Sequence, residues 1–249
     1  MRPDAQKFLQ IIWANIPKGT EHNFQMSKSD KARLKPTTRD IPYDYGSVMH
    51  YGRMEFSRGP DFPTLIPRDQ NYNKTIGQRS FISFTDAKEI NSMYCSKTCP
   101  DDLPCLHGGY ADPKDCSKCR CPEGLGGLLC ATAAKSPAVC GPAYLRARKN
   151  FQNLTMQGES QCNYKIKAPE GKKVTVILDS LKFDGGYFQL VCGESYVEIK
   201  YGSDLQIAGA RFCSKNLLES TEINSVNPVH IIYKSQGSDY GFTLRYKYE

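Results

Sequence analysis

Hydrophobic and polar positions alternate along several stretches of the carboxy-terminal part of the chain, residues 140–249. The alternating apolar sets are Val174, Val176 and Leu178; Val197, Ile199 and Tyr201; and Phe242, Leu244, Tyr246 and Tyr248. A period of two places such side chains on one face of a β-strand. Short strands at this spacing, separated by Gly-rich turns, predict an antiparallel β-sandwich.

A helical period is found at residues 83–94. Thr85 is predicted as the N-cap, followed by Asp86 and Glu89 in the first turn, where acidic side chains stabilise the positive end of the helix dipole. One stripe of this helix is apolar and consists of Ile90, Met93 and Tyr94. We expect the stripe to dock on a core and the helix to end near Cys95.

The first 60 or so residues lack a sustained period and are rich in Lys, Pro and polar residues. They predict mostly irregular chain around one short helix near Ala5–Asn15. Combined with the helix at 83–94 and the carboxy-terminal strands, this pattern predicts an α+β fold that is mainly β.

Composition changes at Cys99. Six cysteines fall between Cys99 and Cys130, separated by 5, 10, 2, 1 and 8 residues. A segment this small cannot bury enough apolar surface to fold alone, so disulfides must replace a core. Small residues with a single Pro make 131–139 a predicted linker. The predicted parts are therefore residues 1–98, 99–130, 131–139 and 140–249.

Cysteine usage indicates the cellular compartment. The 249 residues contain eleven cysteines, which favours a chain oxidised in the secretory pathway. The sequons at Asn73 and Asn153 agree with a secreted glycoprotein. The amino end has no apolar run suited to a signal peptide, and an odd cysteine lacks a partner. We therefore expect the natural protein to extend beyond this amino end.

Charge and hydropathy exclude two partner classes. The net charge is +7, and it is spread along the chain without a Lys/Arg run or an aromatic basic patch. This pattern argues against nucleic-acid binding. Attraction to an acidic matrix or glycan stays open. No stretch approaches the roughly 20 apolar residues that a membrane-spanning helix needs.

The segment Tyr43-Asp-Tyr-Gly-Ser-Val-Met-His-Tyr-Gly52 resembles the Met-turn of the astacin family of zinc metalloendopeptidases. Further motifs are placed as in that family: Asn23-Phe24, Thr75-Ile-Gly-Gln-Arg79, Ser83, Asp86 and Ile90-Asn-Ser-Met-Tyr94. The resemblance implies the carboxy-terminal half of an astacin-like metzincin catalytic domain in residues 1–98.

The rest of the chain resembles two extracellular modules. Residues 99–130 resemble an EGF-like module, and residues 140–249 resemble a CUB domain through Tyr196-Val-Glu-Ile199 and Tyr240-Gly-Phe242. An astacin, EGF and CUB order is similar to that of the larger nematode-type astacins.

In the astacin family the zinc is held by three histidines of HExxHxxGxxH, and the Glu of that motif serves as general base. The sequence contains four histidines and no HExxH, so we expect no metal ligand in it. Met1-Arg-Pro-Asp4 resembles the tail of the stretch that follows the third histidine. The resemblance gives Tyr51 the role of an extra zinc ligand and transition-state stabiliser in a complete enzyme. It makes Met49 the apolar Met-turn residue, while His50 is expected to be a packed or hydrogen-bonded turn histidine.

The resemblance also implies a disulfide pairing. The EGF-type pairs would be Cys99 with Cys116, Cys105 with Cys119, and Cys121 with Cys130; the CUB-type pairs would be Cys140 with Cys162 and Cys192 with Cys213. Cys95 stays unpaired, because its family partner lies near the start of the catalytic domain. Spacing alone leaves 15 connectivities open for the six cysteines. A zinc-binding reading of Cys116-Ser-Lys-Cys119 is disfavoured, because no second ligand pair accompanies it.

Many CUB domains bind calcium through carboxylates, the oxygen ligands that this ion requires. Here Ser195 stands where an Asp is usual, Ser235-Gln236 replaces Ser-Asp, and no Glu is evident around Leu190-Val191. We therefore expect no CUB calcium site, and Asp239 is expected to be a turn residue.

The favoured hypothesis is a secreted, extracellular zinc-dependent metalloendopeptidase of the astacin type that cleaves extracellular matrix or cuticle-like proteins. The 249-residue chain, which lacks HExxHxxGxxH, is expected to be inactive by itself, and residues 1–98 are expected to fold poorly alone. The alternative is a non-enzymatic secreted EGF–CUB binding module. A cytosolic scaffold is excluded by the cysteines.

Overall fold

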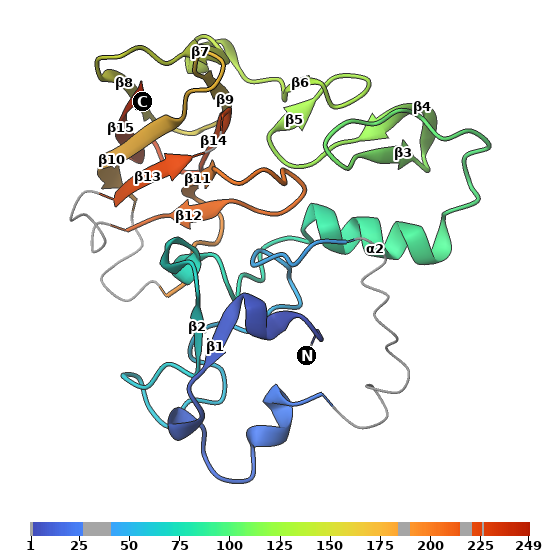
Figure 1. Cartoon of the computed structure of the whole chain (residues 1–249), viewed down its shortest axis with the longest axis vertical. Helices are drawn as coiled ribbons and strands as arrows, with labels where there is room; N and C mark the ends of the chain where they lie inside the picture. The colour runs from blue at the N-terminus through green and yellow to red at the C-terminus, as the bar shows by residue number, and fades with distance from the viewer. Residues whose placement is uncertain (1, 27–40, 184–189, 215–220, 226) are drawn as a thin grey trace.

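The computed structural model describes residues 2–26, 41–183, 190–214, 221–225 and 227–249. Figure 1 shows three parts: an amino-terminal segment (residues 2–98) at the bottom, a cysteine-rich segment (residues 99–139) at the side, and a carboxy-terminal sandwich (residues 140–249) at the top. These names are used below.

The carboxy-terminal sandwich consists of two sheets, as the alternating pattern predicts. One sheet has the strand order β13-β10-β15-β8 and the other β12-β11-β14-β9-β7. All pairs are antiparallel except β7 with β9, which is parallel. The strands are β7 (Tyr144–Arg146), β8 (Gln152–Gln157), β9 (Ser160–Lys167), β10 (Val174–Lys182), β11 (Tyr196–Lys200), β12 (Ala210–Phe212), β13 (Thr221–Ser225), β14 (Val229–Ser235) and β15 (Gly241–Tyr248), preceded by the 3-10 helix η5 (Ala138–Cys140).

The predicted alternating sets form the core between the two sheets. Val174, Val176 and Leu178 are fully buried and pair across β15 with residues of its own alternating set. Strand β11 differs, because both of its faces are buried. In an antiparallel sheet the polar face of such a strand commonly lies in solvent, yet Glu198 is 0% and Lys200 only 4% exposed. The amino-terminal and cysteine-rich segments cover this outer face.

The amino-terminal segment is built from short elements. They are η1 (Ala5–Lys7), β1 (Leu9–Ile11), η2 (Trp13–Asn15), η3 (Glu21–Phe24), β2 (Leu65–Pro67), η4 (Gln70–Lys74) and α2 (Phe84–Tyr94). The predicted helix near Ala5–Asn15 is wrong: two 3-10 turns flank β1, which pairs with β2. Pairing with a strand more than 50 residues away in sequence overrides the local preference, and Leu9 is buried by it. Residues 27–40 of the predicted irregular stretch lie outside the described residues.

Helix α2 begins and ends close to its predicted bounds, but its anchoring differs. Ser83, not Thr85, is the N-cap: its Oγ accepts from the Asp86 N–H at 3.2 Å, and the Asp86 carboxylate accepts from the Ser83 N–H at 3.1 Å. This is a capping box. The apolar stripe, expected to dock, is exposed by 52% at Ile90, 49% at Met93 and 78% at Tyr94. Polar contacts at its amino end, described below, hold the helix instead.

Disulfides dominate the cysteine-rich segment. Its strands are β3 (Tyr110–Asp112), β4 (Asp115–Arg120), β5 (Leu125–Gly126) and β6 (Thr132–Ala133), which form two two-stranded sheets. The chain's five disulfides join Cys99 to Cys116, Cys105 to Cys119, Cys121 to Cys130, Cys140 to Cys162 and Cys192 to Cys213. These are the pairs that the family resemblance implies. The expected linker 131–139 is partly ordered by β6 and by Ser136, whose Oγ accepts from the Asn163 N–H at 2.9 Å.

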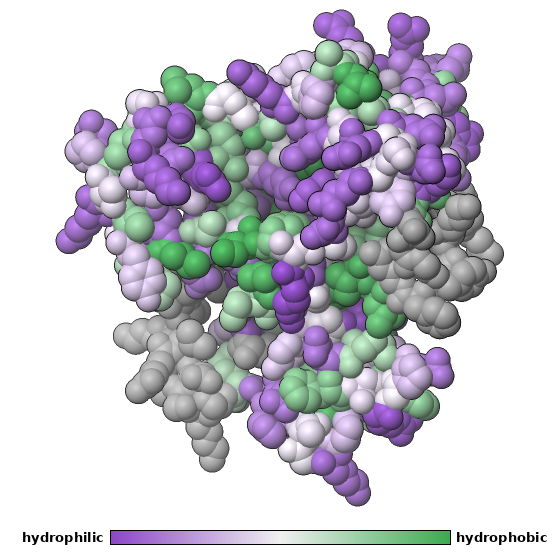
Figure 2. All heavy atoms as spheres, turned by 180° about the vertical axis from the view of Figure 1, so that it is seen from behind, coloured by the Kyte–Doolittle hydropathy of each residue, from purple (hydrophilic) through white to green (hydrophobic). Residues whose placement is uncertain are grey.

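One continuous apolar core joins the amino-terminal segment to the sandwich. It includes Leu9, Phe24 and Ile76 from the former and Ile166, Ile199 and Phe212 from the latter. Seen from behind, apolar side chains gather in a band across the middle of the molecule, with hydrophilic side chains above it (Figure 2). Among the described residues, no helix has the length and apolar character to cross a bilayer.

Candidate functional site

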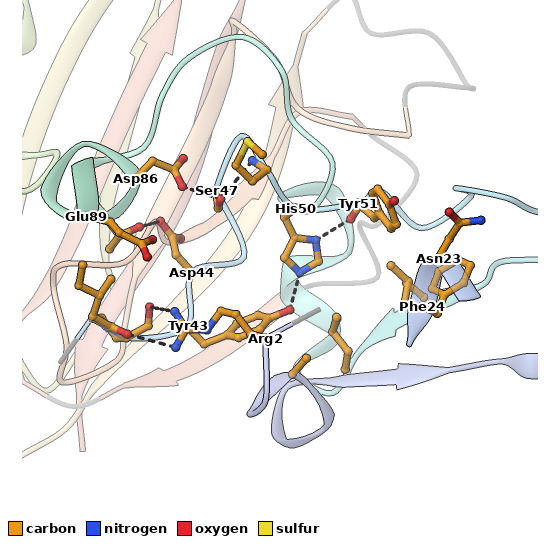
Figure 3. Close-up of a pocket in the computed structure, with 17 residues that line it drawn as sticks. Arg2, Asn23, Phe24, Tyr43, Asp44, Ser47, His50, Tyr51, Asp86 and Glu89 are labelled. Atoms are coloured by element: carbon orange, nitrogen blue, oxygen red, sulfur yellow. Dashed lines mark hydrogen bonds between the residues drawn. The ribbon is translucent and has the colours of Figure 1, made fainter. Parts of the chain in front are cut away.

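The segment Tyr43–Gly52, here called the 43–52 turn, borders a hollow of about 460 Å³ in the amino-terminal segment. Tyr43, Met49, His50 and Tyr51 line it, together with residues of η1, η3 and the start of α2 (Figure 3). The sequence-predicted pair Met49 and Tyr51 therefore faces one cavity.

His50 is fixed inside the turn by both ring nitrogens. Its Nδ1–H donates to the Tyr51 carbonyl oxygen at 2.6 Å, so Nε2 accepts from the Tyr43 hydroxyl at 2.7 Å. Burial lowers the pKa of His50 below its usual value, which favours this neutral form. Both nitrogens are engaged, as expected for a hydrogen-bonded turn histidine.

Tyr51 combines a fixed ring with an unbonded hydroxyl. Its ring packs edge-on against Phe24 at 5.9 Å and against Phe56 at 5.7 Å between ring centroids. Within the described part of the chain, its hydroxyl has no hydrogen-bond partner, in contrast to that of Tyr43. Met49, on the same cavity, is 81% exposed. The turn thus presents one apolar side chain and one free phenol.

Asp86 fastens the turn to helix α2. In addition to capping the helix, its carboxylate accepts from the Ser47 hydroxyl at 2.6 Å and from the Val48 N–H at 2.9 Å. The Met49 N–H in turn donates to Ser47 Oγ at 3.1 Å. One carboxylate at a helix amino terminus therefore holds both the helix and the turn.

Asp44 fastens the turn to the sandwich. This buried carboxylate accepts from the Gly46 N–H at 2.9 Å, from the Thr85 hydroxyl at 2.6 Å, and from the Ala208 N–H at 3.0 Å. Ala208 lies in the loop between β11 and β12. The backbones approach so closely that a Cβ added at Gly46 would lie 2.3 Å from the Ala208 Cβ. The sandwich thus contributes directly to the position of the turn.

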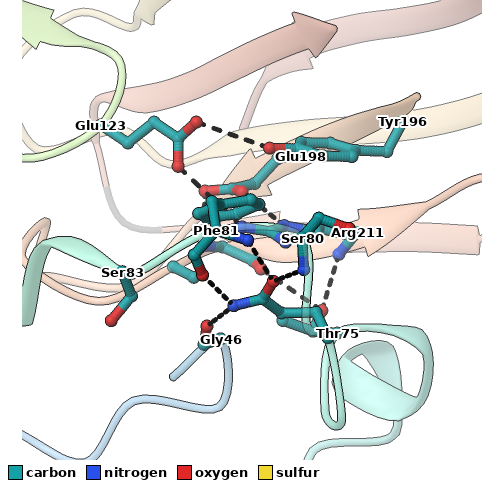
Figure 4. Close-up of polar contacts among 12 residues, drawn as sticks. Gly46, Thr75, Ser80, Phe81, Ser83, Glu123, Tyr196, Glu198 and Arg211 are labelled. Atoms are coloured by element: carbon teal, nitrogen blue, oxygen red, sulfur yellow. Dashed lines mark hydrogen bonds and ion pairs between the residues drawn. The ribbon is translucent and has the colours of Figure 1, made fainter. Parts of the chain in front are cut away.

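Arg211 on β12 is the centre of this contact (Figure 4). Its guanidinium lies between the rings of Phe81, at 4.5 Å, and Tyr196, at 4.4 Å, and its Nε donates to Glu198 at 2.8 Å. Its backbone N–H donates to the Thr75 hydroxyl at 2.9 Å. The residues Arg211, Phe81, Tyr196 and Glu198, together with Glu123, are here called the Arg211 cluster.

The Arg211 cluster joins all three parts of the chain. Glu123 of the cysteine-rich segment lies 3.9 Å from Arg211, and its carboxylate accepts from the Tyr196 hydroxyl at 3.4 Å. Burial opposes the charge of Arg211, but the neighbouring Glu198, Tyr196 and Glu123 groups together outweigh it and hold the pKa of Arg211 above its usual value. Burial, and then the charge of Glu198, raises the pKa of Glu123. Sequence patterns missed this cluster because they assign the polar face of a strand to solvent.

The residues of this chain do not fit a zinc site of the type that the resemblance implies. Among the described residues, no group of three His, Cys, Asp or Glu side chains could hold a metal ion. His50 uses both ring nitrogens within the turn, and His22 lies apart from it, on an exposed 3-10 turn. Cys116 and Cys119 are in disulfides.

The other sequence-predicted residues are dispersed. Cys95, at the C-cap of α2, has no disulfide partner in the described ranges. Asn153 is exposed on β8, whereas Asn73 lies in η4 and donates to Gln70 at 2.8 Å. Ser195, which stands where an Asp is usual in calcium-binding CUB domains, accepts a hydrogen bond from the Gln236 N–H at 3.1 Å.

Comparison with known families divides the chain in the same way. Residues 1–95 match the Astacin family of peptidases, and residues 140–246 match the CUB domain. The amino-terminal segment is therefore part of an astacin domain, and the carboxy-terminal sandwich is a CUB domain.

Individual relatives are nematode proteins. The chain is 40% identical to zinc metalloproteinase nas-30 of Caenorhabditis elegans over 86% of this chain and 28% of nas-30. It is 40% identical to nas-34 of the same organism over 100% of this chain and 39% of nas-34. For nas-26 the identity is 35%, over 99% of this chain and 59% of the relative. The chain thus spans between about a quarter and three fifths of the length of these relatives.

Among solved structures, high choriolytic enzyme 1, a hatching enzyme zinc-protease from Oryzias latipes (medaka fish), is 34% identical. The match covers 36% of this chain and 42% of that chain with a TM-score of 0.31, too low to support a structural argument.

Proposed function

We propose that the protein acts as a secreted zinc-dependent metalloendopeptidase of the astacin type, to which this chain contributes the Met-turn half of the catalytic site. The observation that carries the proposal is the state of Tyr51, which lines the hollow with a packed ring and a hydroxyl that has no partner in the described part of the chain. Such a phenol is placed to donate a hydrogen bond to the oxyanion that forms when a scissile carbonyl is attacked. Met49 supplies the apolar wall beside it.

The remaining roles in this proposal rest on the resemblance to the astacin family. HExxHxxGxxH, which would hold zinc and activate water, is not in these 249 residues, so the chain alone is proposed to be inactive. The substrates are proposed to be extracellular matrix or cuticle-like proteins. Residues 99–130 are proposed to be an EGF-like module, and Asn73 and Asn153 are proposed glycosylation sites. Five disulfides support an extracellular location.

The test is to express the complete native transcript that encodes these residues and to compare its product with the Tyr51→Phe variant. Removal of one oxyanion donor is expected to lower kcat by about 10²–10³-fold, with zinc content unchanged. A zinc-loaded Tyr51→Phe variant whose kcat equals that of the parent enzyme would exclude the role of Tyr51. Absence of chelator-sensitive peptidase activity from the complete protein would exclude the proposed function as a whole.

A further inference from the structure

An open groove of about 1170 Å³ lies at the edge of the CUB domain where β7 pairs with β9. The turn from β9 to β10 forms its other side. The cationic side chains that line it are Arg146, Lys165, Lys167, Lys172 and Lys173. Four of them are exposed and Lys165 is half-buried, while Glu170 is the one carboxylate among the described lining residues.

Strand register concentrates these charges. In the parallel pair of β7 with β9, Arg146 lies opposite Lys167, and Tyr144 lies opposite Lys165. Like charges placed directly opposite each other destabilise a sheet. Across β14, the same row continues from Lys165 to His230 and then to Lys200. Burial, followed by the charges of Lys165 and Lys200, lowers the pKa of His230 to about 3.

The cationic side chains of the groove outnumber Glu170, its one carboxylate among the described lining residues. In the residues that the structure describes, the ion pairs lie elsewhere, and none involves the five cationic groups of the groove. On the neighbouring sheet, by comparison, Arg245 is paired with Asp179 at 2.9 Å. The groove is therefore a region of net positive potential on a β-sheet scaffold.

We propose that this groove binds a sulfated polysaccharide. Ammonium and guanidinium groups donate charge-assisted hydrogen bonds to anionic oxygens, and a row of flexible cations suits sulfates repeated along a chain. A single-stranded nucleic acid fits less well, because it needs a series of aromatic stacking platforms. Tyr144 is the single aromatic residue among the described lining, and its hydroxyl already accepts from the Ala133 N–H at 3.1 Å. The proposal does not depend on peptidase activity.

The experiment measures binding of fluorescently labelled heparin to the full 249-residue chain by anisotropy over a salt series. The groove variant is Lys167→Gln/Lys172→Gln/Lys173→Gln. Its matched control, Lys18→Gln/Lys114→Gln/Lys182→Gln, removes the same charge from exposed positions outside the groove. All six side chains are exposed, so both variants are expected to keep the thermal midpoint of the parent chain.

Heparin is expected to bind the parent chain, and the groove variant is expected to bind about 10- to 100-fold more weakly. The slope of log affinity against log salt should fall by roughly two to three, since each lost contact releases one counterion fewer. The control variant should lose less than about threefold, and desulfated heparin should bind poorly.

Four results would overturn the proposal. Equal losses in the groove and control variants would mean that binding follows net charge rather than the groove. Equal binding of desulfated heparin, or no binding of heparin by the parent chain, would exclude a sulfated polysaccharide as the ligand of the groove. Tighter binding of single-stranded DNA, with the same dependence on the groove lysines, would make a nucleic acid the occupant.

Discussion

The Arg211 cluster and the hollow over the 43–52 turn both include residues of the astacin-type segment, and they differ in how far the chain supplies partners for their polar groups. In the cluster, Arg211 is fully buried, and its charge is balanced by Glu198 of the neighbouring strand and by Glu123 of the cysteine-rich segment. In the hollow, Met49 is 81% exposed, and the Tyr51 hydroxyl has no partner in the described residues. The described chain therefore supplies the charged partners of its contact between domains, while its candidate site stays chemically partial.

The difference has an energetic basis. A buried charge without a partner costs several kcal/mol, so a cluster such as that of Arg211 exists only where every segment that supplies it is in place. An exposed Met or an unbonded phenol at a cavity wall costs far less. The exposed apolar stripe of α2, Ile90, Met93 and Tyr94, is tolerated for the same reason.

The largest effect is expected from Arg211→Met. The variant leaves Glu198 as a buried carboxylate without a counter-charge, which should cost about 3–5 kcal/mol of unfolding free energy. Guanidinium unfolding with disulfides intact measures it. The control is Arg211→Met/Glu198→Gln, which removes the stranded charge, keeps an acceptor for the Gly209 N–H, and should recover most of the loss. A loss below about 1 kcal/mol in the single variant would contradict a buried ion pair.

Gly46→Ala tests the contact between the turn and the CUB domain. The added methyl would lie 2.3 Å from the Ala208 Cβ, so one backbone must move. Overpacking of this kind is expected to cost about 1–3 kcal/mol. The double variant Gly46→Ala/Ala208→Gly restores the space and should regain most of that stability. If Gly46→Ala is neutral, or if Ala208→Gly does not rescue it, the two loops do not pack as described.

His230 is a second buried basic group, on the same covered outer face as Lys200. Unlike Arg211, it has no counter-charge in the described residues. Burial lowers its pKa to about 3, so the unfolded chain binds the proton more readily between pH 3 and 6.5. Stability from this group is therefore lost as pH falls, by about 1.4 kcal/mol at pH 5.5 relative to pH 8. His230→Gln should remove that part of the pH dependence, whereas the exposed His22→Gln should not. Equal pH profiles for the parent chain and His230→Gln would contradict a buried neutral histidine.

The smallest effect separates two tyrosines of the hollow. Tyr43→Phe removes the hydrogen bond to His50 and should cost about 1 kcal/mol. Tyr51→Phe removes a hydroxyl with no partner in the described chain and should change stability by less than about 0.5 kcal/mol. Thermal unfolding of both variants measures the contrast. A larger loss for Tyr51→Phe than for Tyr43→Phe would mean that Tyr51 has a structural role.

Periodicity predicted which strand faces form the sandwich core and where helix α2 lies. Val174, Val176 and Leu178 are buried as their spacing indicates, and α2 lies where its helical period begins and ends. Periodicity could not show which second surface covers the other face of β11. For that reason the burial of Glu198 was not foreseen, and the stripe at Ile90 was expected in a core, which was wrong.

The candidate site was predictable only in part, for a related reason. The motif around Met49 and Tyr51 is local in sequence, so its residues could be named before the structure. The contacts that hold it are distant: Asp44 with Ala208 and Thr75 with Arg211 are separated by more than 130 residues. No local pattern encodes such pairs, since each depends on how two domains dock.

The central proposal, that these 249 residues hold a positioned but chemically partial peptidase site, is tested most directly by zinc content and peptidase activity of the purified chain. The account predicts zinc well below one ion per chain and no chelator-sensitive cleavage of unfolded protein substrates. One zinc ion per chain together with chelator-sensitive cleavage would contradict it.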